Sequence, residues 1–496
     1  MSGTPGHETH TGTRPTPPAE PRADGRPTTI TPLDGTGPDD GIVRSAPTTF
    51  GQRAQWYEQM AAPPERRHLF NLCQWWKLAV PAAEPDVRAA LAELVRRHEG
   101  LRTTLVDDAA AGGLVQRVHE VRPLDVPVDT VADRDTNMLE HPLVKQVSGA
   151  SFDLSRDLPV RFGLVRGGDG LVWLVLCVVN HSASDAFAHA LLRNEFHQLL
   201  AAPPRQWRRD ERRAQPCDIA ASENSASGRR RHQRTLAYLR AKYLEAPLSP
   251  RLPDGAEGMT GKRPRTMVRV DLYSPALRTA SRWLRNAERV SLGALVLAPF
   301  SSLFAVHTGQ ERVPFKVMVT NRFEPGTGTS LACMCQPGLT VLRTARTETV
   351  MEAARRCQHD LLKAYHHGKY DIESVERLLA EAAAEHGPVR LERLFDCLDK
   401  QPGAVLDTAP TRADLELGSE VTCSEPFQAH GTEQTLRVRG RGSDVWVTLL
   451  TDTEVLPAEL ARQSLRAVEA AAVGSCSGAP PSVADLAAEF GFAAGG

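Results

Sequence analysis

The sequence predicts an α/β protein of two lobes, each with a mixed sheet flanked by helices. Strand-like and helix-like segments alternate in both halves of the chain, and neither half shows the regular parallel alternation of a barrel. The length of 496 residues also allows more than one core, since a single core stops growing near roughly 250–300 residues. We expect a disordered tail at residues 1–45, an N-terminal lobe at 46–215 and a C-terminal lobe at 216–496.

The composition argues against several classes of protein. Residues 1–45 are rich in Pro, Gly, Thr and charge, which is typical of a disordered tail, and they lack the pattern of a signal peptide. No apolar run reaches the roughly 20 residues that span a bilayer. The net charge of −1 gives no global attraction to nucleic acid or to a membrane. Nine cysteines without framework spacing indicate reduced thiols in a cytoplasm.

The close pair Cys333 and Cys335 is the one arrangement of thiols that invites a metal. It lacks a second Cys or His pair at the spacing of a zinc site. We therefore expect buried thiols and no metal ion there.

In the N-terminal half, turn residues and apolar periodicity predict each element in order. A proline and apolar residues at helical spacing begin a helix at residue 85, and Gly100 is expected to end it. The other expected elements are a helix within 48–60 and strands at 68–80, 101–106, 113–121 and 158–166.

The stretch VVNHSASDAF at 178–187 is the most informative one. Residues 171–179 are apolar throughout and follow a Gly-rich turn, which predicts a strand covered on both faces. Residues 186–201 return to helical periodicity, so Asp185 stands where a carboxylate caps a helix. His181 thus follows a buried strand and precedes a helix, a position at which open α/β sheets commonly bind ligands.

The same His-x-x-x-Asp spacing recurs at His367 and Asp371, so spacing alone has little weight. That second pair follows a helix and lies in a charged, Gly-containing loop. Context therefore favours His181 as the functional histidine. On the residues alone, a core histidine beside a capping aspartate remains the alternative.

The C-terminal half begins after an Arg-rich segment, 203–234, which we interpret as a solvated linker and the start of a helix. A docking patch for an acidic partner is the alternative, and nucleic-acid binding is disfavoured because few aromatic residues interleave with the arginines. The expected elements are strands at 266–274, 313–323 and a pair within 331–343, helices at 274–291, 291–309, 349–367 and 457–473, and further segments at 390–399 and 436–452.

In their order, these motifs resemble those of the condensation domains of nonribosomal peptide synthetases, within the chloramphenicol acetyltransferase-like superfamily. The stretch NHSASDA (180–186) stands where the family has His-His-x-x-x-Asp-Gly. The other similar stretches are TFGQRAQWY (49–57), RHEGLRTTL (97–105), FDLSRDLPVRFGLVR (152–166), TGQERVPFKVMVTNR (308–322) and HHGKYDIESV (366–375).

The resemblance implies a role for each residue of the site. His181 corresponds to the family's second, catalytically implicated histidine, and Asp185 to an aspartate that pairs with an arginine of the other lobe, here Arg322. Asn180 replaces the first histidine, which is mainly structural in the family, and can still form a hydrogen bond. Ala186 replaces a glycine and adds a Cβ where the backbone approaches the substrate.

The resemblance also implies a fold and an activity. We expect two chloramphenicol-acetyltransferase-like lobes with an active-site tunnel between them. The expected reaction is amide or ester formation in secondary-metabolite assembly, such as antibiotic biosynthesis. A free-standing acyltransferase would join an acyl thioester, carried on the phosphopantetheine of an acyl or peptidyl carrier protein in trans, to a small amine or alcohol. No bound cofactor or metal is expected.

Two alternatives to the condensation reaction remain open. One is a coenzyme-A-dependent acyltransferase of the same superfamily, which would use the same histidine and a different donor. The other is a catalytically silent recruitment protein, suggested by Asn180 and Ala186. Retention of both His181 and Asp185 favours an enzyme.

Overall fold

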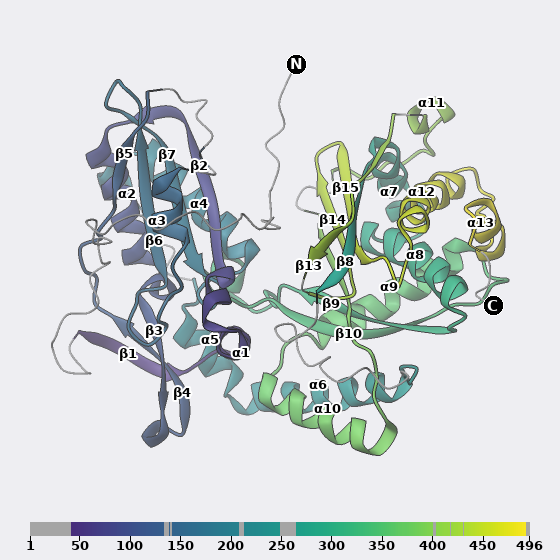
Figure 1. Cartoon of the computed structure of the whole chain (residues 1–496), viewed down its shortest axis with the longest axis horizontal. Helices are drawn as coiled ribbons and strands as arrows, with labels where there is room; N and C mark the ends of the chain where they lie inside the picture. Colours follow the sequence, from purple (N-terminus) through teal and green to yellow (C-terminus); the bar gives the residue numbers. More distant parts are fainter. Residues whose placement is uncertain are drawn as a thin grey trace, which may run out of the picture.

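The computed structural model describes residues 41–492 apart from 133–137, 139–140, 208–212, 249–263, 400–402, 417 and 430. Most of the tail expected at residues 1–45 therefore lies outside the described residues. The described part of the chain forms two lobes side by side (Figure 1). This confirms the predicted fold class of mixed sheets flanked by helices.

The first lobe contains a four-stranded and a three-stranded sheet. Their strand orders are β2-β7-β6-β5 and β1-β4-β3. The strands are β1 (Ile42–Pro47), β2 (Asn71–Ala82), β3 (Thr103–Asp108), β4 (Gly113–His119), β5 (Val128–Thr130), β6 (Val160–Arg166) and β7 (Val172–Asn180). The helices are α1 (Phe50–Ala61), α2 (Glu84–Arg97), α3 (Pro142–Ser148) and α4 (Ala186–Ala201).

Strand β7 is the centre of the first lobe, and all nine of its residues are buried. It pairs antiparallel with β2 on one side and with β6 on the other. Leucines of α2 and α4 pack on one face of the sheet and residues of α3 pack on the other. The predicted strand covered on both faces is confirmed, and its uniform apolar composition follows from this double burial.

The second lobe contains an eight-stranded sheet in the order β10-β9-β11-β14-β15-β8-β12, with β13 also paired to β8. Its strands are β8 (Arg265–Tyr273), β9 (Arg312–Val319), β10 (Gln336–Arg343), β11 (Arg393–Asp399), β12 (Glu420–Cys423), β13 (Phe427–Ala429), β14 (Gln434–Arg441) and β15 (Asp444–Asp452). The helices after residue 215 are α5 (Pro216–Glu223), α6 (Ala226–Glu245), α7 (Pro275–Ala287), α8 (Leu292–Thr308), α9 (Val350–His366), α10 (Ile372–His386), α11 (Arg412–Leu415), α12 (Ala458–Ser475) and α13 (Val483–Glu489).

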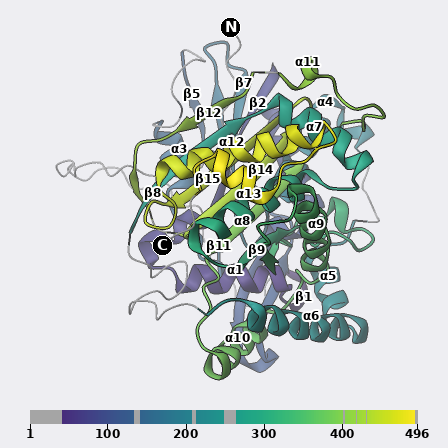
Figure 2. The same cartoon turned by 90° about the vertical axis from the view of Figure 1, so that its right-hand side faces the viewer.

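Helices cover one face of the eight-stranded sheet, and the other face is turned toward the first lobe. Figure 2 shows α7, α8, α9 and α12 in front of the strands. Alternate residues of the strands, such as Val317, Phe395 and Val438, belong to the core that these helices complete. The helices α6 and α10 pack against each other and against β10.

Helix α8 is buried along almost its whole length, which explains its continuously apolar sequence. Among the described residues, no single helix has the length and apolar character needed to cross a membrane. Within the described ranges, α7 and α8 taken together reach that length and composition, but they are bent by 106° relative to one another.

Several expected boundaries are wrong. Residues 42–45, placed in the tail by composition, belong to β1, where long-range pairing with β4 orders a locally polar segment. The strand pair expected within 331–343 is a single strand, β10, which begins only at Gln336, because residues 331–335 lie outside the sheet and approach the first lobe. Strand β9 ends at Val319, since Asn321 takes a left-handed conformation at φ 54°.

Gly100 does not end α2, which stops at Arg97. The glycine lies instead in a short 3-10 helix, Glu99–Arg102. A Cβ at this position would stand 2.8 Å from the carbonyl oxygen of Leu331 in the second lobe. The absence of a side chain at Gly100 therefore permits close contact between the lobes.

Candidate active site

The candidate active site lies on the turn between β7 and α4. The backbone N–H of His181 donates to the carbonyl of Phe70 at 2.8 Å, which holds the residue at the end of the sheet. Asp185 caps α4 because its Oδ1 accepts a hydrogen bond from the backbone N–H of Ala188 at 2.8 Å. The cap predicted from the sequence is thus present, and it fixes the far end of the loop that carries His181.

Arg322 of the second lobe contacts the loop that carries His181 and Asp185. Its Nη2 donates to both carboxylate oxygens of Asp185 at 3.0 Å, and both side chains are almost fully buried. The same Asp185 carboxylate accepts a hydrogen bond from the backbone N–H of Met334 at 3.0 Å. Arg322 also donates from Nη1 to the backbone carbonyls of Thr327 and Ser330 and from Nη2 to that of Ala332, while its Nε has no partner among the described residues. We call Asp185, Arg322 and Met334 the active-site link.

The conformation of Asn321 directs Arg322 toward Asp185. Its left-handed backbone is compensated by two hydrogen bonds from its side-chain amide, to the carbonyls of Met334 at 2.9 Å and Gly368 at 2.8 Å. Asn tolerates this region better than most residues. The chain therefore reverses at this point, leaving β9 and placing a guanidinium between the lobes.

Asn180 holds the turn before His181 in place through two side-chain hydrogen bonds. Its side-chain amide donates to Gln59 of α1 at 2.9 Å, and its Oδ1 accepts from the backbone N–H of Ser182 at 2.9 Å. The residue is fully buried and both polar groups have partners, so the turn is held in place without a histidine. Ala186, the other departure from the family motif, is exposed at the first position of α4.

Burial lowers the pKa of His181 below its ordinary value. Hydrogen bonds to the backbone of His181 and Ser184 and the charge of Asp185 act in the opposite direction. The Sγ of Cys333 lies 3.7 Å from Nδ1 of the imidazole, and burial raises the pKa of this thiol. At neutral pH the imidazole is therefore neutral and can accept a proton, whereas the thiol is not ionised.

The stretch RHEGLRTTL supports the helix that follows the site. Arg97 donates to Oε1 of Glu195 on α4 at 2.9 Å, and Nε2 of buried His98 lies 3.0 Å from Oε2 of the same carboxylate. These contacts tie the end of α2 to the middle of α4. They stabilise the element that Asp185 caps and lie outside the turn that carries His181.

The second His-x-x-x-Asp pair has a structural role. Asp371 caps α10 and pairs with Arg53 of α1 at 3.1 Å. The ring of His367 stacks on Tyr238 with 4.4 Å between centroids. His367 and Asp371 therefore join helices, and the choice of His181 over this pair agrees with their surroundings.

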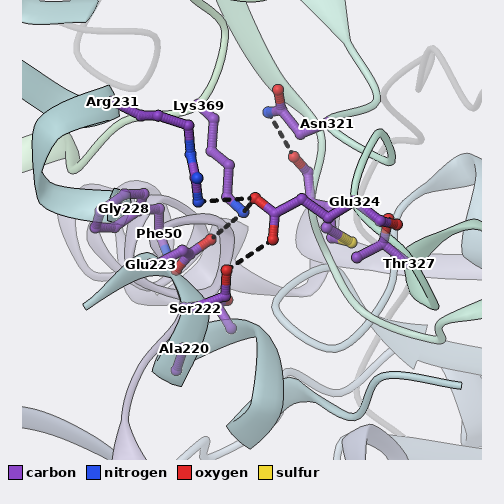
Figure 3. A network of polar contacts seen from close by, with 12 residues as sticks. Phe50, Ala220, Ser222, Glu223, Gly228, Arg231, Asn321, Glu324, Thr327 and Lys369 are labelled. Atoms are coloured by element: carbon purple, nitrogen blue, oxygen red, sulfur yellow. Dashed lines mark hydrogen bonds and ion pairs between the residues drawn. The ribbon is translucent and has the colours of Figure 1, made fainter. Parts of the chain in front are cut away.

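A second polar group joins the lobes beside α1. Glu223 accepts a hydrogen bond from the backbone N–H of Phe50 at 2.8 Å and lies 3.4 Å from Nζ of Lys369. Lys369 also contacts Glu324 at 3.2 Å, as does Arg231, and Ser222 donates to the same carboxylate (Figure 3). We call these residues the Glu223 cluster. Burial raises the pKa of Glu223 to about 7, although Lys369 acts to lower it.

Sequence reasoning missed several residues that position the site. Gln59, Cys333 and the backbone of Met334 reach it from distant segments, and no local pattern marks them. In the sequence the stretch ACMC stands out as a close pair of thiols, and nothing in it shows that Cys333 and Met334 reach the loop of His181. Among the described residues, no group of three or more His, Cys, Asp or Glu is placed to hold a metal ion. The expected absence of a cofactor remains a prediction.

Comparison with known sequences gives a consistent family. The family model described as "Condensation domain" matches residues 43–412. A probable non-canonical nonribosomal peptide synthetase, CymA of Salinispora arenicola, is 29% identical over 216 residues, which are 42% of this chain and 3% of that protein. Chondramide synthase cmdD of Chondromyces crocatus is 26% identical over 363 residues, 65% of this chain and 9% of that protein. The chain thus spans less than a tenth of either relative.

Comparison with solved structures shows the same fold. The condensation domain from the monacolin K polyketide synthase MokA superposes with a TM-score of 0.68 at 18% identity, covering 90% of this chain and all of that one. SgcC5 from Streptomyces globisporus superposes with a TM-score of 0.61 at 18% identity, covering 86% and 98% of the two chains. The predicted chloramphenicol-acetyltransferase-like fold class is therefore confirmed, while the tunnel between the lobes remains a prediction.

Proposed function

The chain belongs to the condensation-domain family, and on this premise we propose that it is a free-standing enzyme of secondary-metabolite assembly. It would form an amide or ester bond between an acyl thioester on a carrier protein and a small amine or alcohol. Condensation domains are acyltransferase-type enzymes that work with carrier proteins in such systems. Action on a carrier in trans and the chemical class of the acceptor are parts of the proposal.

The observation that carries the proposal is the neutral imidazole of His181, held at the end of a buried strand by a loop fixed at both ends. A neutral histidine can take the proton of an amine or hydroxyl as that group attacks the thioester carbonyl. The carbonyl carbon gains the new C–N or C–O bond, the C–S bond breaks, and the thiol of the carrier arm leaves with the proton. Cys333 does not compete as a nucleophile because its thiol stays protonated.

Positioning supplies a further part of the rate. Fixing two substrates against one another converts a bimolecular reaction into an effectively unimolecular one. The active-site link would serve this purpose, since it joins the loop of His181 to the second lobe at a buried ion pair. Asn180 keeps both of its hydrogen bonds, and this supports an active enzyme over a silent recruitment protein.

A product assay by mass spectrometry tests the proposal. Acyl groups loaded on carrier proteins and on coenzyme A would be mixed with amines and alcohols, with wild-type protein and His181→Ala. We expect condensed product from carrier-bound donors and a loss of roughly 10²- to 10⁴-fold in kcat for the variant. His367→Ala is the matched control, because it removes the histidine of the structural pair.

The outcomes of this assay decide the role of His181 and distinguish the three candidate functions. Equal rates for wild type and His181→Ala would remove His181 from the chemistry. A preference for coenzyme A thioesters would favour the acyltransferase of the same superfamily. Binding of a carrier without any product would favour the recruitment protein.

A further inference from the structure

The face of the eight-stranded sheet that is turned toward the first lobe has a row of polar side chains. Leu436 and Val438 of β14 point into the helix-covered core, so Arg437 between them points to the opposite face. In register, Arg437 lies between Asp396 of β11 and Thr448 of β15. Figure 1 shows β14 and β15 between the helices of the second lobe and the first lobe.

Arg437 has no partner among the described residues, whereas its neighbours do. Asp396 is already paired with Arg439, and Asp271 is paired with Arg269 at 2.8 Å. The guanidinium of Arg437 is half-buried and makes no hydrogen bond or ion pair within the described chain. Burial lowers the pKa of Arg437, while the charge of Asp396 acts to raise it. A cation withdrawn from water without a partner is costly, and an anionic ligand would offset that cost.

The row lies close to the candidate active site. Strands β9, β11 and β14 run parallel, and Phe395 pairs with Val317, so Asp396 and Arg437 lie level with Met318, just before the turn at Asn321. The thiol of Cys335 gives a second indication, since its pKa responds to both Asp185 and Asp396. Arg437 therefore lies on the face turned toward the first lobe, level with the end of β9 that leads to Arg322.

We propose that Arg437 binds a carboxylate of the acceptor and thereby orients its amine or hydroxyl toward His181. This proposal rests on the proposed condensation function. An arginine suits a carboxylate because its planar donors match the two oxygens. The acceptor would then be a free amino or hydroxy acid, since an acceptor loaded on a carrier has its carboxyl group tied up as a thioester.

A phosphate is the other anion that the reaction brings to the protein, on the phosphopantetheine arm. The phosphate stands at the opposite end of the arm from the thioester, away from the reacting carbonyl. The nearby cations Arg439 and Arg269 are already paired with Asp396 and Asp271, so Arg437 is the one positive charge of this group without a partner in the described part of the chain, which suits one negative charge better than two. The carboxylate is therefore the ligand that fits.

The test compares acceptors that differ only in charge. Amino acids and their primary amides would be offered with N-acetylcysteamine acyl thioesters, which carry no phosphate, and with the same acyl groups on carrier proteins. For Arg437→Gln we expect the KM of the acids to rise roughly 10- to 100-fold, with the KM of the amides unchanged. Arg437→Lys should recover part of the loss. Arg269→Gln, which removes a paired arginine from the same face, should leave the preference for acids intact.

Two kinetic results would overturn the proposal. Equal KM values for acids and amides in the wild type would show that no carboxylate is recognised. An effect of Arg437→Gln that appears only with carrier-bound donors would assign the residue to the phosphate of the arm.

Failure of the condensation reaction can be separated from failure of this site. Ligand-observed NMR would compare binding of the same acids and amides to wild type and Arg437→Gln without a donor. Acid-selective binding that is lost in the variant would keep the anion site even if no product forms. Binding without acid selectivity would overturn it.

Discussion

Two of the polar groups that join the lobes, the active-site link and the Glu223 cluster, differ in how completely their charges are satisfied. In the active-site link, both oxygens of Asp185 are bonded to Arg322 and each also accepts a backbone N–H. In the Glu223 cluster, the buried carboxylate has one backbone donor and a lysine at 3.4 Å that it shares with Glu324. The first arrangement holds its charges in a fixed geometry, and the second leaves a carboxylate whose pKa is raised to about 7.

The difference indicates distinct roles for the two contacts. A carboxylate whose two oxygens each accept from a guanidinium and from a backbone N–H fixes a loop in one position. A buried glutamate that titrates near neutral pH makes the contact between the lobes sensitive to protons. We therefore expect the active-site link to dominate stability and the Glu223 cluster to dominate its dependence on pH.

Removal of Arg322 should have the largest effect. Arg322→Ala leaves the Asp185 carboxylate buried without its counter-ion, which costs about 3–5 kcal/mol in the free energy of unfolding. Urea unfolding followed by tryptophan fluorescence measures the change. Arg412→Ala is the control, because Arg412 is 90% exposed and its pair with Glu416 should contribute under about 1 kcal/mol. Unchanged stability of Arg322→Ala would show that the link does not hold the lobes.

A methyl group between the lobes should have the next largest effect. A Cβ on Gly51 of α1 would stand 2.1 Å from the carbonyl oxygen of Cys333, so the backbone beside His181 must shift. We expect Gly51→Ala to lower the free energy of unfolding by about 1–3 kcal/mol and to reduce activity. The control is Gly418→Ala, which has open space around it and should change stability by less than about 1 kcal/mol. Normal stability and activity of Gly51→Ala would disprove this tight packing.

The Glu223 cluster should make the free energy of unfolding depend on pH. The pKa of Glu223 in the folded state, about 7, lies above its ordinary value, so the folded protein binds the proton more tightly than the unfolded chain. The resulting stability is complete at low pH and is lost as the pH rises through 7. Glu223→Gln cannot ionise, so the loss of stability between about pH 5 and pH 8 should shrink by on the order of 2 kcal/mol.

Urea unfolding at both pH values measures that difference, with Glu416→Gln as the exposed control. The same loss of stability in wild type and Glu223→Gln would assign the pH dependence to other groups.

The smallest expected effect is on the pH profile of the reaction. Burial lowers the pKa of His181, so kcat/KM should fall only below the ordinary histidine value of roughly 6.5. A profile measured with the best donor and acceptor checks this. An acid limb above that value would contradict a base that is neutral at pH 7.

Local signals predicted the segment around His181 well. The apolar run before it and the helical periodicity after it predict β7 and α4, and Asp185 caps the helix as expected. These features depend on neighbouring residues, which a sequence displays directly. The contact of Asp185 with Arg322 was expected only from the resemblance to the family, because 137 residues separate the two side chains.

Features set by contact between the lobes could not be predicted. The sequence indicates a helix stop at Gly100, since nothing in it shows that Leu331 approaches this residue. Composition places residues 42–45 in the tail, because the strand β4 with which they pair lies far along the chain. Arg437 and Glu223 resemble ordinary charged residues of a strand and a helix, and only their surroundings distinguish them.

The two backbone amides bonded to the Asp185 carboxylate also make separation of the lobes observable. The carboxylate holds the amide of Ala188 within its own lobe and that of Met334 in the other. Hydrogen exchange of Met334 requires that the lobes part, whereas exchange of Ala188 requires only fraying of α4. The ratio of the two exchange rates therefore distinguishes opening between the lobes from local unfolding of the active-site loop.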